Sequence, residues 1–87
     1  METGRDSVAE RLASADPAVR AATAAELGAA RAPARLDLLI ERLAAESVPE
    51  VVIALLRAIG QLGSARELSL LAQYIDHADP RVRATVI

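Results

Sequence analysis

Asp16-Pro17-Ala18-Val19-Arg20 is the stretch that decides the fold, because Asp79-Pro80-Arg81-Val82-Arg83 repeats its pattern 63 residues later. Proline is best tolerated in the first turn of a helix, where its missing N–H would have no partner, and a preceding aspartate can cap that helix. Pro17, Pro33 and Pro49 stand sixteen residues apart. The spacing predicts a new helix about every sixteen residues, and hence stacked helical hairpins of about 32 residues.

Other landmarks give nearly the same period. The segment Val8–Ala13 matches Leu39–Ala44 at an offset of 31, and Leu27-Gly28 matches Ile59-Gly60 at an offset of 32. Because these glycines fall near expected helix ends, they predict left-handed C-terminal caps. Three serines, each followed three residues later by glutamate, predict capping boxes that begin at Ser7, Ser47 and Ser64.

The caps and the apolar stripes together predict an all-α fold. The expected helices are 7–14, 17–30, 33–46, 49–62, 65–77 and 80–87. Connections of two to four residues make neighbouring helices antiparallel. We therefore expect residues 1–6 to be a disordered or frayed N-terminus. The remainder forms one repeat domain, with units at about 7–30, 33–62 and 65–87.

Composition excludes several classes of function. The chain has no cysteine, which rules out disulfides and thiolate chemistry, and its only aromatic residue is Tyr74. A net charge of −2 provides no basic field for nucleic acid or anionic lipid. The N-terminus lacks a signal-peptide pattern, and no apolar run is long enough to span a bilayer. A cytoplasmic location without membrane attachment is expected.

The repeated pattern resembles the HEAT-repeat family, especially its short bacterial form, the PBS-lyase-type HEAT-like repeats. The resemblance rests on Asp16–Gly28 and on Asp79–Arg83, and it covers about residues 7–87. It implies a right-handed α-solenoid of stacked antiparallel hairpins with about six helices, the last one truncated. It also implies that the chain supplies an interaction surface, since the family mostly does so.

The resemblance further assigns structural roles to four residues. Family members link successive repeats through the aspartate and arginine of the motif, which implies a polar ladder of Asp16, Arg20, Asp79 and Arg83. The middle unit departs from the pattern, because Val48 and Val52 replace the aspartate and the arginine. An interruption of the ladder is therefore expected there.

The sequence ends at Ile87, inside the last expected helix, with Val82, Val86 and Ile87 on an uncapped apolar face. Terminal repeats of solenoids normally carry a polar cap. Two explanations stay open. The chain is the N-terminal part of a larger protein, or its last helix pairs with a second copy.

Catalytic and metal-binding chemistry finds no support in the residue pattern. His77 is the only histidine, and with Asp76 and Asp79 it lacks the second histidine or cysteine that a zinc site needs. No serine has a histidine placed to activate it. We expect no enzyme activity, no metal and no cofactor.

The remaining hypothesis is a protein–protein interaction or scaffold module that presents a rigid, curved helical surface to a protein or peptide. Its concave face is predicted to carry Glu50, Ile53, Arg57, Gln61 and Arg81, beside a row of alanines one repeat earlier. The alanines have a second explanation, because they also allow close helix packing. The alternatives are a nucleic-acid-binding HEAT-like module and an accessory function of the bilin-lyase type. The first is disfavoured because the chain has no surplus of basic charge and no aromatic residue placed to stack on bases, and the second rests on resemblance alone.

Overall fold

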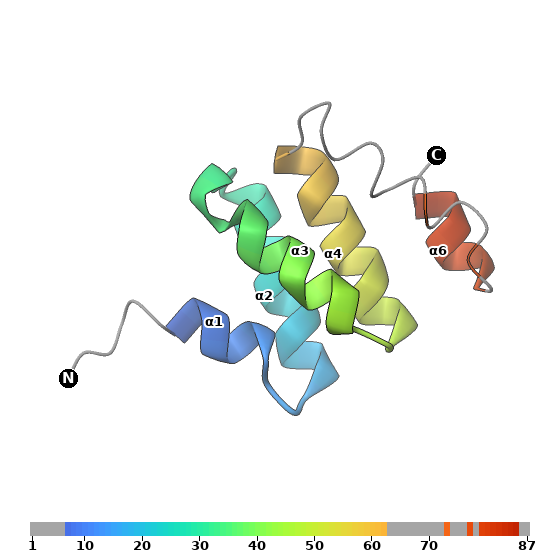
Figure 1. Cartoon of the computed structure of the whole chain (residues 1–87), viewed down its shortest axis with the longest axis horizontal. Coiled ribbons are helices and arrows are strands. Elements are labelled where there is room, and N and C mark those ends of the chain that lie inside the picture. Colours follow the sequence, from blue (N-terminus) through green and yellow to red (C-terminus); the bar gives the residue numbers. More distant parts are fainter. Residues whose placement is uncertain (1–6, 63–72, 74–76, 78, 86–87) are drawn as a thin grey trace.

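The computed structural model describes residues 7–62, 73, 77 and 79–85 (Figure 1), and these contain α-helices, one 3₁₀ turn and no strand. The all-α HEAT-like architecture expected from the sequence is confirmed. In chain order, the elements are α1 (Ser7–Leu12), α2 (Pro17–Ala29), the 3₁₀ turn η2 (Pro33–Arg35), α3 (Leu36–Ala45), α4 (Pro49–Leu62) and α6 (Pro80–Thr85). The expected helix 65–77 lies outside the described residues, except for 73 and 77.

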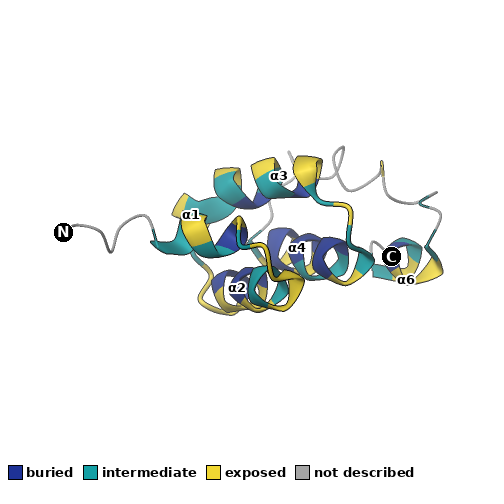
Figure 2. Cartoon of the chain, turned by 90° about the horizontal axis from the view of Figure 1, so that it is seen from below, coloured by how far each residue is buried: buried dark blue, intermediate teal, exposed yellow. Residues whose placement is uncertain are grey.

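The helices form two layers, which Figure 2 shows in side view. Helices α1 and α3 make one layer, and α2, α4 and α6 make the other. The first two hairpins, α1–α2 and α3–α4, each contribute their first helix to one layer and their second helix to the other. The second helices therefore stand side by side, and α4 packs between α2 and α6.

Helix α4 is the centre of the core. Its buried residues cover a broad face of the helix, because α2, α3 and α6 all pack against it. They are Val51, Val52, Leu55, Leu56, Ala58 and Ile59. The neighbouring helices contribute Leu27, Leu39, Leu43 and Val82 to the same cluster. Helical spacing in the sequence places Val51, Leu55, Ile59 and Leu62 on a single apolar stripe of this helix, so it did not predict the burial of Val52, Leu56 and Ala58.

Three α-helices, α2, α4 and α6, begin at a proline, and two of them have the predicted aspartate cap. Asp16 accepts a hydrogen bond from the N–H of Ala18 at 2.9 Å, and Asp79 accepts one from the N–H of Arg81 at 2.8 Å. The capping box predicted at Ser47 is wrong. Val48 occupies the cap position before Pro49, and its N–H donates to the carboxylate of Glu46 at 3.0 Å.

The third predicted helix begins later than expected. Residues Pro33–Arg35 form a 3₁₀ turn, and the α-helix starts at Leu36 and ends at Ala45. The turn carries no side-chain cap, since Ala32 precedes it. The proline thus starts a helical turn at the expected place, but without a capping side chain.

The prediction of left-handed glycine caps at Gly28 and Gly60 is wrong, because both lie inside helices. Gly28 is buried where α2 meets α4. A Cβ atom at position 28 would come within 2.8 Å of the Cα of Ala58. The left-handed position after α2 belongs to Arg31, with a φ of 51°. Glycine at 28 therefore permits close helix approach, and a non-glycine residue ends the helix.

Candidate partner-binding site

The loops before α2, α4 and α6 share one hydrogen-bonding pattern. In each, the residue three positions before the helix proline accepts a bond from the backbone N–H two residues further on. The three acceptors are Ser14, Glu46 and His77, at donor–acceptor distances of 3.1, 3.0 and 3.0 Å. A hydroxyl, a carboxylate and an imidazole thus occupy equivalent positions. The three loops are more alike in structure than in sequence.

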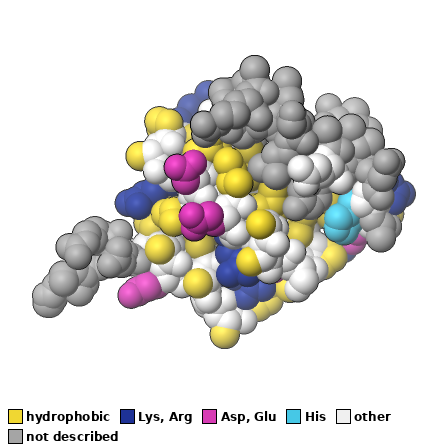
Figure 3. Space-filling view, viewed as in Figure 1, with side chains coloured by type: hydrophobic (Ala, Val, Ile, Leu, Met, Phe, Trp, Pro, Cys, Tyr) yellow, Lys and Arg dark blue, Asp and Glu magenta, His cyan; other side chains and the backbone are white. Residues whose placement is uncertain are grey.

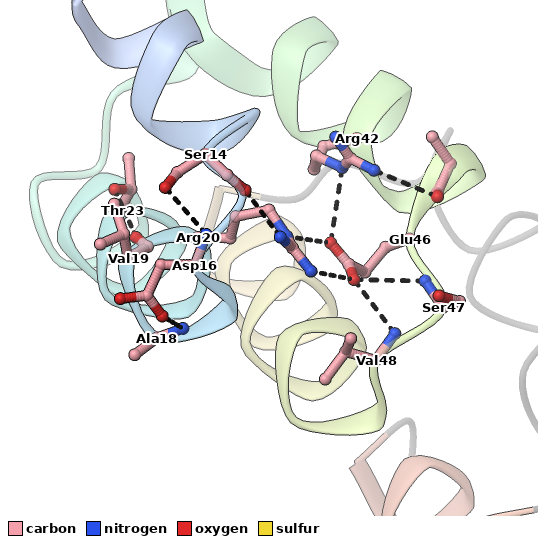
Figure 4. A network of polar contacts seen from close by, with 11 residues as sticks. Ser14, Asp16, Ala18, Val19, Arg20, Thr23, Arg42, Glu46, Ser47 and Val48 are labelled. Atoms are coloured by element: carbon pink, nitrogen blue, oxygen red, sulfur yellow. Dashed lines mark hydrogen bonds and ion pairs between the residues drawn. The ribbon is translucent and has the colours of Figure 1, made fainter.

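Arg20 links the first loop to the second (Figure 4). Its Nε and Nη2 atoms donate to the two carboxylate oxygens of Glu46 at 2.8 and 3.0 Å, and its Nη1 donates to the carbonyl of Ser14 at 2.6 Å. The side chain of Glu46 is 1% exposed and that of Arg20 is 12% exposed. A bidentate arginine–carboxylate pair fixes both distance and orientation. The contact therefore sets how the second hairpin sits on the first.

A second arginine lies close to the carboxylate of Glu46. Arg42, one turn earlier on α3, places its Nε 3.5 Å from the carboxylate, close enough for an ion pair but outside hydrogen-bonding geometry. Burial alone would raise the pKa of Glu46. Hydrogen bonds from Arg20 and from the N–H of Val48, with the charges of Arg20 and Arg42, outweigh burial and hold this pKa below its usual value.

A second link joins α6 to α4 at the surface. Arg81 donates to Glu50 at 3.2 Å and to Asp79 at 2.9 Å. The side chains of Glu50 and Arg81 are 63% and 57% exposed. Hydrogen bonds from the side chain and backbone N–H of Arg81 lower the pKa of Asp79 to about 2.

The structure places the four expected ladder residues as follows. Arg20 crosses between hairpins, whereas Asp16 and Asp79 cap their own helices. Arg83 donates to the carbonyl of His77 at 2.7 Å, as Arg20 does to Ser14. The interruption expected at Val48 and Val52 does not separate the first two hairpins, because Glu46 receives Arg20 there.

Sequence reasoning missed Glu46 and Arg42. The signal that could have found Glu46 is its register, since it precedes Pro49 by the same three residues that separate Ser14 from Pro17. An acidic residue at that position, one repeat after an arginine of the motif, indicates a link between repeats.

Five residues were predicted to line a partner-binding face, and they lie on the layer formed by α2, α4 and α6. Arg57 and Gln61 are exposed, and Ile53 is half-buried against the core. The structure brings Glu50 and Arg81 together, and it places the amide of Gln61 over Gly28 of α2. The five residues therefore lie on α4 and α6, and Gln61 reaches toward α2.

A groove lies beside them, against the row of alanines that the sequence indicated one repeat earlier. It has a volume of about 270 Å³, and its lining is mostly apolar. It is lined by Pro17, Ala18, Ala21, Val48 and Glu50. The short side chains of Ala18 and Ala21 on the first turns of α2 leave this space, while the Gly28–Ala58 contact keeps the other ends of α2 and α4 close together.

The described part of the chain holds no group of three or more histidine, cysteine, aspartate or glutamate residues that could bind a metal ion. Among the helices of that same part, none is both long enough and apolar enough to cross a membrane.

Comparison with known proteins agrees with this architecture. No curated protein and no solved structure matches the chain. The family model for HEAT repeats matches residues 5–87, which is nearly the whole sequence. Repeats of this kind generally mediate protein interactions or scaffolding and are typically non-enzymatic. The structure has the arrangement of stacked helical repeats: two hairpins are joined through Arg20 and Glu46, and α6 packs beside α4. The chain belongs to the HEAT-repeat family.

Proposed function

We propose that this domain binds a protein or peptide partner on the layer formed by α2, α4 and α6, as one module of a larger scaffold. The observation that carries the proposal is the apolar groove between the first turns of α2 and α4. A groove of about 270 Å³ can accept one or two side chains of an extended or helical segment.

The rim of this groove supports recognition of a peptide. Glu50 stands at its edge and is held by Arg81 from α6. Further along the layer, Ile53 offers partly exposed apolar surface, and Arg57 and Gln61 offer polar groups. Apolar contacts surrounded by polar groups are typical of protein interfaces.

The same layer is poorly suited to nucleic acid. Arg81 is bound by Asp79 and Glu50, and Arg20 is bound by Glu46, so neither presents a free charge. Phosphate binding depends on several cations that release counterions together. Within the described ranges, Arg57 is the exposed cation of this layer that no carboxylate neutralises.

Affinity capture from the source cell tests the proposal with three forms of the protein: wild type, the double variant Ile53→Asp/Arg57→Glu and the control Ala44→Glu. Ala44 is exposed on α3, in the other layer. We expect the double variant to lose a partner that wild type and control retain. Retention of every partner by the double variant would refute the proposal, and salt-sensitive recovery of nucleic acid instead would favour the alternative function.

A further inference from the structure

The layer formed by α1 and α3 carries a repeated Glu-Arg pair that the proposed function does not use. It occurs as Glu10-Arg11 on α1 and as Glu41-Arg42 on α3, 31 residues apart. In both copies the arginine is engaged by the carboxylate of another glutamate. Arg11 bonds Glu26 of α2 at 2.9 Å, and Arg42 forms an ion pair with the buried Glu46.

The glutamates of the two pairs behave differently from the arginines. Glu10 and Glu41 are both exposed, and the carboxylate of neither makes a hydrogen bond or ion pair with any residue in the described ranges. The arginine beside each of them is already neutralised. Each repeat therefore presents one uncompensated carboxylate on the outside of this layer.

An apolar groove lies between these two helices. It has a volume of about 220 Å³, and its floor contains Leu12 and Leu38 with the small side chains of Ala9 and Ala13. Two charged residues of α3 also line the groove: Glu41, and Arg42, whose charge is paired with Glu46. Figure 3 views this layer from outside and shows hydrophobic side chains with both acidic and basic ones near them. Because the arginines of the two pairs are engaged by other carboxylates, the unpaired charges beside the apolar groove, in the described part of the chain, are those of Glu10 and Glu41.

We propose that the groove between α1 and α3 is a second docking surface, whose occupant is a basic amphipathic helix of another protein. Leucine-sized side chains of that helix would fill the groove, and flanking lysines or arginines would pair with Glu10 and Glu41. Helix-in-groove recognition uses such apolar anchors at i, i+3, i+4 and i+7. The charge of the rim selects a cationic partner and repels anionic lipid or nucleic acid.

This assignment does not apply to the groove between α2 and α4. Its rim carboxylate, Glu50, is already bound by Arg81. The carboxylate at that groove is paired, whereas those beside the groove between α1 and α3 are not. The two surfaces are therefore expected to bind different partners.

The probe is a fluorescein-labelled 14-residue peptide with leucine at helical i, i+3, i+4 and i+7 spacing and lysine elsewhere. A matched peptide has glutamate in place of lysine. We expect fluorescence anisotropy to show binding of the lysine peptide alone. The variant Glu10→Gln/Glu41→Gln should weaken this binding about three- to tenfold, as expected for the loss of two exposed ion pairs.

Two further variants separate this site from general attraction to an acidic protein. Asp16→Asn/Glu50→Gln removes the same charge from the other layer, with asparagine retained as a helix cap, and should leave binding unchanged, whereas Ala45→Leu fills the groove between α1 and α3 and should abolish binding. Circular dichroism checks that each variant is folded. Equal binding of the two peptides, or equal weakening by both double variants, would overturn the proposal. A dimer in sedimentation velocity that Glu10→Gln/Glu41→Gln dissociates would overturn it in favour of a second copy as occupant.

Discussion

Arg20 on α2 and Glu46, at the end of α3, form a buried bidentate ion pair with N–O distances of 2.8 and 3.0 Å. The two residues are 26 positions apart in the sequence and belong to successive hairpins. Arg20 also bonds the carbonyl of its own loop, so one guanidinium organises two loops. The angle between the hairpins is therefore set by polar geometry as well as by apolar packing.

Replacing Arg20 with methionine is expected to destabilise the domain by about 3–5 kcal/mol. The substitution leaves a nearly inaccessible carboxylate with Arg42 as its remaining cation, and breaking one side of a buried pair is costly. Urea unfolding followed by circular dichroism at 222 nm measures this loss.

The double variant Arg20→Met/Glu46→Gln serves as the control. Glutamine keeps an acceptor for the N–H of Val48 but carries no charge. We expect the double variant to be clearly more stable than the sum of the two single effects predicts. Additive effects would show that the two side chains do not act as a pair.

The stability of the domain should depend on the protonation of Glu46. Its folded-state pKa lies below the usual value of 4.5, so the unfolded chain takes up the proton first as the pH falls. The stabilisation is complete above about pH 5 and is lost progressively below that. Asp79 adds a similar loss at lower pH, since its pKa falls from 3.8 to about 2.

Glu46→Gln tests this dependence directly. The variant should be less stable than wild type at neutral pH, yet its free energy of unfolding should fall less steeply between about pH 5 and pH 3. Unfolding curves at several pH values give both slopes. Parallel slopes for the two proteins would mean that Glu46 is not the group responsible.

Gly28 and Gly60 form a matched pair for helix packing. Gly28→Ala is expected to destabilise the domain by about 1–3 kcal/mol, because the new methyl group meets the backbone of Ala58. Gly60→Ala has open space around it and should stabilise α4 by about 0.5–1 kcal/mol. Thermal unfolding measures both changes. Similar shifts in the same direction would contradict the close approach of α2 and α4.

Arg31→Gly should stabilise the end of α2. Arg31 has a φ of 51°, and its N–H and that of Ala32 bond the carbonyls of Gly28 and Leu27, as in a Schellman cap. Glycine adopts this conformation without strain from a Cβ atom, so we expect a gain of about 0.5–1 kcal/mol. A loss of stability in chemical denaturation would show that the arginine side chain contributes more than its backbone conformation costs.

The sequence predicted the features that depend on local chemistry. Asp16 and Asp79 cap helices because a carboxylate just before a first-turn proline lies within reach of the free backbone N–H groups of that turn. The apolar stripe of α4 follows from helical spacing. Pro33 indicated a helical turn correctly, although the α-helix proper begins at Leu36.

Features that depend on contacts between distant residues could not be predicted in the same way. Glu46 resembles a surface residue of a helix end until Arg20 is placed beside it. Gly28 resembles a helix-ending glycine until Ala58 is seen against it. The two grooves exist because short side chains lie where two helices meet, and a single helical stripe does not contain that information.

The measurement that tests the central claim most directly is site-specific photo-crosslinking in the source cell. A benzophenone amino acid is placed at Arg57 on α4 or, for comparison, at the exposed Ala44 on α3. We predict that a partner crosslinks at position 57 and not at position 44, and that Ile53→Asp abolishes the crosslink. The absence of any crosslink at position 57, or a crosslink at position 57 that survives Ile53→Asp, would contradict binding on the layer of α2, α4 and α6.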